Sequence, residues 1–178
     1  MTKIEDKKST NKKTKKKFPY RIYLDNGRIV PVPSQHDFSS SFIRSHGCSL
    51  VAMYMGLRFL GVKKSLSNCK KYLDRNYGLH GRKKYALSII VKAMNKISSS
   101  SKAKFYKNLP SERIKEELKK GNMVLFEERG PIHTVVLLYN GKDIKRFSDG
   151  KYKSVTVNQE VKKRCGDGHY GGCIVIKK

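Results

Sequence analysis

The spacing of apolar residues divides the chain into a helical first half and a strand-rich second half. From Cys48 to Leu60, apolar residues recur at three- and four-residue steps, which predicts a helix that ends at Gly61. Weaker helical patterns span about 67–76 and 82–97, and a further one begins at Ser111. Because the helix from Cys48 has almost no polar side, we expect it at the centre of the domain.

An Asn-Gly dipeptide near the start of the chain indicates a β-hairpin. The strand-like segments 20–24 and 28–32 flank Asn26 and Gly27. This dipeptide favours hairpin turns because both of its residues tolerate positive φ. Pro31 lacks the N–H group that a ladder needs, so we expect the second strand at the edge of a sheet.

The second half of the chain reads as strands separated by turn dipeptides. The strands are MVLFEE, IHTVVLLY, DIKRFS, YKSVTV and CIVI, with a short helix from about Asn158 before the last one. Gly130-Pro131, Asn140-Gly141 and Asp149-Gly150 separate the first four and predict an antiparallel meander. Helices first and strands afterwards indicate an α+β fold, in which a helical layer packs on an antiparallel sheet.

The length of the chain, 178 residues, suits a single domain. Residues 1–17 contain eight lysines and little that can be buried, so they predict a disordered basic tail before a domain at 18–178. No apolar segment follows these charges and no run has the length of a membrane span. We therefore expect a cytoplasmic protein without a membrane span.

The formal net charge is +26, from 40 Lys and Arg against 14 Asp and Glu. Such a surface attracts polyanions, so one hypothesis is a basic module that binds nucleic acid or an acidic wall polymer. The alternative is a Lys-rich composition that only keeps the protein soluble. No basic stripe interleaved with aromatic residues is visible in the linear sequence, and no DNA-binding motif.

Cys48 is the candidate nucleophile. It opens the apolar helix, where the first backbone N–H groups have no partner inside the helix, and their partial positive charge favours a thiolate. The alternative is a small apolar residue at the start of a core helix. The sequence has four cysteines and no signal peptide, so thiols used in catalysis or metal binding are favoured over disulfides.

A cysteine nucleophile needs a histidine and a group that orients it. His133 begins the most apolar strand. With a turn at Asn140-Gly141, residues whose numbers sum to about 281 face each other, which predicts Ser148 and Asp149 beside His133. The alternative for Asp149 is an ordinary turn residue. For the oxyanion, the Cys48 backbone N–H supplies one donor, and the amide of Gln35 in the preceding loop is a candidate second donor.

These residues, in this order, resemble the papain-like cysteine peptidases. The segments SQHD…HGCSLVAMYMGLRFLG and IHTVVLLYNGKDIKRFSDG are similar to those of the bacterial branch of bacteriocin-processing (double-glycine leader) peptidases. The resemblance implies a papain-like fold and a peptide or protein substrate, with no cofactor. It implies the following roles: Cys48 as nucleophile, His133 as general base and acid, Asp149 as the group that orients the histidine, and Gln35 as oxyanion donor.

The sequence departs from that branch at two positions. Ser49 follows the cysteine and Ile132 precedes the histidine, where many relatives have glycine. The bulkier Ile132 is expected to narrow the cleft. The same apparatus also serves acyl transfer to an amine.

A zinc site is a lesser alternative. Cys165, Asp167, His169 and Cys173 lie close together in a Gly-rich segment and carry ligand atoms that zinc accepts. The usual C-x2-4-C pairing is absent, so a Gly-rich turn is the favoured interpretation and we expect no metal.

Overall fold

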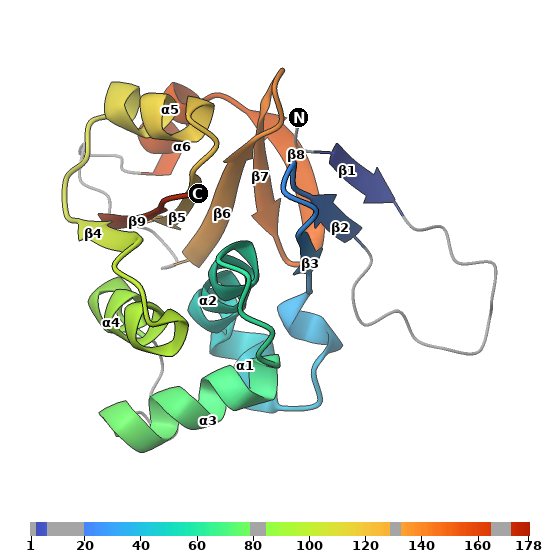
Figure 1. Ribbon diagram of the computed structural model, residues 1–178, viewed down its shortest axis with the longest axis vertical. Coiled ribbons are helices and arrows are strands. Elements are labelled where there is room, and N and C mark those ends of the chain that lie inside the picture. Colours follow the sequence, from blue (N-terminus) through green and yellow to red (C-terminus); the bar gives the residue numbers. More distant parts are fainter. Residues whose placement is uncertain (1–2, 7–19, 79–84, 129–132, 165–171) are drawn as a thin grey trace.

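A computed structural model describes residues 3–6, 20–78, 85–128, 133–164 and 172–178 (Figure 1). The fold is mixed α+β, with a six-stranded sheet, a three-stranded sheet and helices against them. Every strand pairing in the two sheets is antiparallel. The predicted α+β class with an antiparallel sheet is confirmed.

The six-stranded sheet has the order β4-β9-β5-β6-β7-β8. The predicted meander is confirmed as β5 (Met123–Glu128), β6 (His133–Tyr139), β7 (Ile144–Ser148) and β8 (Lys151–Val155). The last strand, β9 (Gly172–Ile176), pairs with β5 on the other side. β4 (Ala103–Tyr106) was not predicted; it completes the sheet by pairing with β9.

The small sheet contains the predicted hairpin of β2 (Tyr20–Tyr23) and β3 (Ile29–Val32), with β3 at an edge. Its third strand, β1 (Lys3–Asp6), pairs with β2. The prediction of a disordered tail is therefore wrong for these four residues. Backbone hydrogen bonds to a neighbouring strand can order a segment that has few apolar side chains to bury, and amino-acid composition does not reveal such pairing.

Helix α2 (Cys48–Phe59) lies at the centre of the fold, as predicted. It contacts β6 and β3 on one side and α3 (Leu66–Tyr77) and α4 (Leu87–Ser98) on the other. Gly56 permits this close packing, because a Cβ atom there would lie 2.6 Å from Met94 Cε and 2.7 Å from Ile176 Cδ1. Two short helices precede α2 and were not predicted: η1 (Gln35–Asp37) and α1 (Ser41–His46).

The large sheet is covered on both faces, whereas the pattern predicted a single helical layer. Helices α2 and α4 pack on one face. Residues of α5 (Ser111–Lys119) and of α6 (Val157–Arg164) pack on the other. The strands explain this difference, since β5 and β9 are buried along nearly their whole length and need cover on both sides. No helix in the described part of the chain is long and apolar enough to cross a membrane.

Candidate active site

Cys48 is the first residue of α2, directly after Gly47. Gly47 also caps α1, so the two helices meet at this glycine. A Cβ atom on Gly47 would lie 2.3 Å from the carbonyl oxygen of Ile43, so only glycine fits here. The tight junction places the half-buried Cys48 thiol at the positive end of a 12-residue helix.

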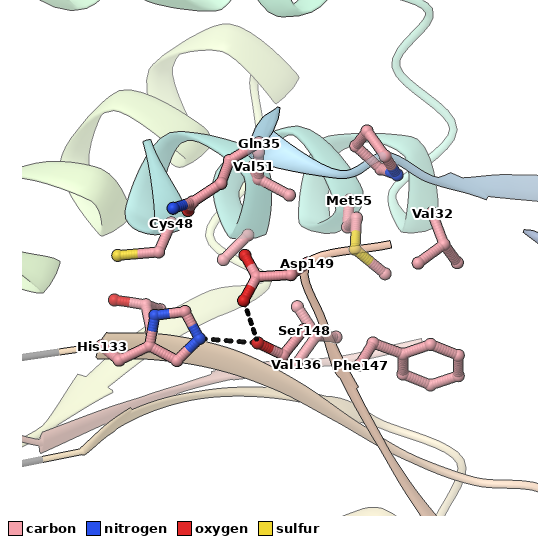
Figure 2. A pocket seen from close by; sticks show the side chains of 13 residues that line it. Val32, Gln35, Cys48, Val51, Met55, His133, Val136, Phe147, Ser148 and Asp149 are labelled. Atoms are coloured by element: carbon pink, nitrogen blue, oxygen red, sulfur yellow. Dashed lines mark hydrogen bonds between the residues drawn. The ribbon is translucent and has the colours of Figure 1, made fainter. Parts of the chain in front are cut away.

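His133 begins β6 and lies beside Cys48 (Figure 2). Burial acts to raise the pKa of Cys48, but hydrogen bonds from His133 and the Thr134 backbone, with the charge of His133, hold that pKa below the usual thiol value. The hydrogen bond to Cys48 raises the pKa of His133 against the opposing effect of burial, and the charges of Cys48, Asp149 and Glu128 add to the rise. These opposite shifts favour a thiolate–imidazolium pair.

Ser148 contacts the nitrogen of the His133 ring that points away from Cys48 (Figure 2). Its Oγ atom lies 2.6 Å from His133 Nε2 and donates a hydrogen bond to Asp149 Oδ2 at 3.3 Å. A hydroxyl that donates to a carboxylate is free to accept from Nε2–H. The other ring nitrogen then lies on the side of Cys48 (Figure 2).

The predicted register between β6 and β7 is wrong by two residues. Val136 faces Phe147 and Tyr139 faces Ile144. The turn contains four residues because the Asn140 side chain accepts hydrogen bonds from the backbone of Lys142 and Asp143. Asp149 lies beyond the end of β7 and reaches His133 through Ser148, which the sequence placed beside His133 without assigning it a role.

Asp149 lies in the turn between β7 and β8 with a left-handed φ of 50°. This turn packs tightly on the loop before η1, since a Cβ atom on Gly150 would lie 2.8 Å from Ser34 Cβ. The close approach brings Asp149 over the site. Its Oδ1 atom lies 3.9 Å from His36 Nε2, a solvent-exposed contact that screening keeps weak.

Gln35 lies in η1 and lines the same pocket as Cys48. Its Nε2 atom donates to the Arg44 carbonyl at 2.9 Å, and its Oε1 atom is buried without a hydrogen-bond partner among the described residues. A side-chain amide has two N–H bonds. One of them holds Gln35 on α1, which leaves the other for the predicted oxyanion.

Ser49 links the two halves of the site. Its hydroxyl is buried and lies 3.0 Å from the Thr134 hydroxyl, next to His133 on β6. The serine at a position where the resemblance predicts glycine therefore fastens the start of α2 to the strand that carries the histidine. The other departure, Ile132, lies outside the described residues. The expected narrowing of the cleft by this side chain therefore stays a prediction.

The pocket runs from Cys48 and His133 beneath α2 to Val32 and Phe147 (Figure 2). The cavity has a volume of about 10 Å³, enough for about one water molecule. Most of its walls are apolar, so charges at its mouth are poorly solvated. Its lining residues are Val32, Pro33, Gln35, Cys48, Val51, Ala52, Met55, His133, Thr134, Val136, Phe147, Ser148 and Asp149.

The remaining described cysteines differ from Cys48. Cys69 and Cys173 are buried, and burial raises the pKa of the Cys69 thiol to about 11. Cys165, Asp167 and His169, the other members of the zinc alternative, lie outside the described residues. Within the described ranges, no three His, Cys, Asp or Glu side chains are grouped so as to hold a metal ion.

Chemically, the site combines a thiol of lowered pKa, an imidazole of raised pKa and a hydroxyl–carboxylate chain behind the ring. These are the parts that a thiolate nucleophile with a general acid–base partner requires. The chain matches no protein-family model, no curated protein and no solved structure, so the inference of function rests on this geometry.

Proposed function

We propose that this protein is a cysteine peptidase of the papain-like type, which hydrolyses a peptide or amide bond through a thioester. The observation that carries the proposal is that Cys48, at the start of a buried helix, and His133, at the start of a sheet strand, lie side by side in one pocket and shift each other's pKa in opposite directions (Figure 2). A central helix that carries the thiol and packs on an antiparallel sheet that carries the imidazole agrees with the papain-like arrangement.

In the first half of the reaction, the Cys48 thiolate attacks the carbonyl carbon of the scissile bond. Negative charge develops on the carbonyl oxygen, where the Cys48 backbone N–H and the second N–H of Gln35 would stabilise it. The imidazolium of His133 then gives its proton to the leaving amine from the ring nitrogen on the Cys48 side. The C–N bond breaks and a thioester to Cys48 remains.

In the second half, water attacks the thioester carbonyl and His133 takes the proton of that water. Collapse of the tetrahedral intermediate breaks the C–S bond, releases the acid and restores the thiolate–imidazolium pair. Throughout, the Ser148 hydroxyl accepts a hydrogen bond from Nε2–H, and Asp149 orients that hydroxyl. Acyl transfer follows the same path with an amine in place of water.

Selective alkylation tests the proposal directly. With limiting iodoacetamide, Cys48 should react much faster than Cys69, Cys165 and Cys173, as peptide mapping by mass spectrometry would show. The variant His133→Gln should slow the labelling of Cys48 and leave the other three rates unchanged. Equal labelling of all four thiols in the native protein would refute an activated thiolate.

A further inference from the structure

Helix α3 carries a row of basic and amide side chains on its outward face. Leu66, Cys69 and Leu73 are the buried side of the helix. On the opposite side, Asn68, Lys71 and Arg75 follow one another at helical spacing, and Lys64 extends the row just before the helix. From Asn68 to Arg75 the row covers about 10 Å at 1.5 Å per residue.

These side chains border a shallow groove. The groove has a volume of about 460 Å³, and none of the residues that line it is acidic. We define the α3 groove by these residues: Lys64, Asn68, Lys71, Tyr72, Arg75 and Asn76. Tyr72 and Asn76 form one flank, so an aromatic ring lies beside the row of cations.

The single carboxylate of α3 is engaged away from the α3 groove. Asp74 forms an ion pair with Lys70 and accepts a hydrogen bond from the Tyr85 hydroxyl at 3.2 Å. Lys70 also lies 5.5 Å from the centre of the Phe42 ring. Among the described residues, no Asp or Glu pairs with the three cations of the α3 groove, Lys64, Lys71 and Arg75. Their charge is available to an external anion.

The chemistry of the α3 groove favours one kind of polyanion. Lysine and arginine beside an aromatic ring are the parts with which proteins bind single-stranded nucleic acid, where cations contact phosphates and rings stack on bases. The amides of Asn68 and Asn76 can donate to and accept from base edges or sugars. An anionic membrane is disfavoured, because among the described residues only Ile29, on β3, is a large and exposed apolar side chain.

We propose that the α3 groove binds single-stranded nucleic acid. Its three cations, Lys64, Lys71 and Arg75, can each contact a phosphate of a short single strand. Helix α3 contacts α2 and α4 and lies far from the six-stranded sheet that carries His133 (Figure 1). The binding site is therefore separate from the Cys48 pocket, and the proposal does not depend on the peptidase reaction.

The test measures binding of fluorescein-labelled oligothymidylate to the full chain by anisotropy over a series of salt concentrations. The groove variant combines Lys64→Gln, Lys71→Gln and Arg75→Gln. The control variant removes the same charge elsewhere, with Lys104→Gln, Lys142→Gln and Lys151→Gln. The groove variant should bind on the order of tenfold more weakly, with a slope of log K against log salt that is about 2 units shallower. The control should stay close to the parent.

Two further comparisons test the aromatic flank and the class of ligand. Tyr72→Leu should weaken binding about tenfold, whereas Tyr72→Phe, which keeps the ring, should not. Iodoacetamide labelling of Cys48 should be unchanged in every variant, which verifies the fold. Equal loss of affinity in the groove and control variants would overturn the proposal. Tighter binding to duplex DNA or to polyglutamate than to oligothymidylate would also overturn it.

Discussion

His133 Nε2 lies 2.6 Å from Ser148 Oγ, and no carboxylate oxygen occupies that position. The carboxylate of Asp149 binds the Ser148 hydroxyl at 3.3 Å instead, so the orienting chain runs from histidine through serine to aspartate. A neutral hydroxyl in contact with the ring stabilises the imidazolium less than a carboxylate in contact with it would. The stabilising negative charge must therefore come mainly from the Cys48 thiolate, in agreement with the order of the effects on the His133 pKa.

The first prediction concerns this serine. Ser148→Ala removes the partner of Nε2 and should lower the rate of Cys48 alkylation, and of peptide hydrolysis, by about 10- to 100-fold, since a hydrogen bond to a charged group contributes about 1.5–3 kcal/mol. Ser148→Thr keeps the hydroxyl and should retain most of the rate. Asp149→Asn should have a smaller effect than Ser148→Ala. A larger effect of Asp149→Asn would show that the carboxylate acts on His133 directly.

The second prediction concerns pH. The lowered pKa of Cys48 keeps its thiolate at pH values below the usual thiol range, and the raised pKa of His133 keeps the imidazolium above its usual range. Hydrolysis should therefore follow a bell-shaped profile, which falls on the acid side as Cys48 gains a proton and on the alkaline side as His133 loses one.

The pH dependence of alkylation isolates the acid limb. In the native protein, the iodoacetamide rate should rise with a midpoint below the ordinary thiol pKa of about 8.5. In His133→Gln that midpoint should move upward, because burial then acts on Cys48 without the histidine to oppose it. A midpoint that is the same in both proteins would contradict the assigned pair.

The third prediction concerns the link between Ser49 and Thr134. Ser49→Ala leaves the buried Thr134 hydroxyl without this partner and should reduce the free energy of unfolding by about 1–3 kcal/mol, measured by urea denaturation. The double variant Ser49→Ala/Thr134→Val removes both hydroxyls. Its loss of unfolding free energy should be smaller than the sum of the losses in Ser49→Ala and Thr134→Val. A loss equal to that sum would argue against the contact.

The fourth prediction compares two glycines with nearly the same backbone conformation. Gly150 has a φ of 70° and Gly27 has a φ of 74°, so the backbone strain of an alanine should be similar at the two positions. At Gly27 a Cβ atom meets nothing within 4 Å, whereas at Gly150 it would lie 2.8 Å from Ser34 Cβ. Gly150→Ala should therefore cost about 1–3 kcal/mol more than Gly27→Ala in urea unfolding.

The same pair of variants also tests the site. Displacement of the Gly150 turn from Ser34 should move Asp149 and Ser148 and slow the labelling of Cys48. Gly27→Ala lies in the β2–β3 turn, outside the residues that line the pocket, and should leave that rate unchanged. Equal effects of the two substitutions on stability and on labelling would mean that the close approach to Ser34 has no role.

Local sequence determined the elements that carry the candidate site. The three- and four-residue apolar spacing after Gly47 predicts α2, and the apolar run from His133 predicts β6, because burial of one face imposes a period on the chain. The positions of Cys48 and His133 at the starts of these elements follow directly. The turn dipeptides likewise predict the order of the meander, since their allowed backbone angles are a property of the residues themselves.

The tertiary structure decided how those elements meet. The Asn140 side chain lengthens a turn that its dipeptide predicts to be tight, which shifts the register between β6 and β7. In the folded site, Ser148 lies between His133 and Asp149. β1 and β4 form only because β2 and β9, respectively, offer them a free edge, and both of these strands are distant in the sequence. The outward row on α3 is visible only once its buried face is known. The Asn140 turn depends on side-chain hydrogen bonds that the dipeptide alone does not specify. The other two features depend on contacts between segments far apart in the chain, and the spacing of residues within one segment carries no information about them.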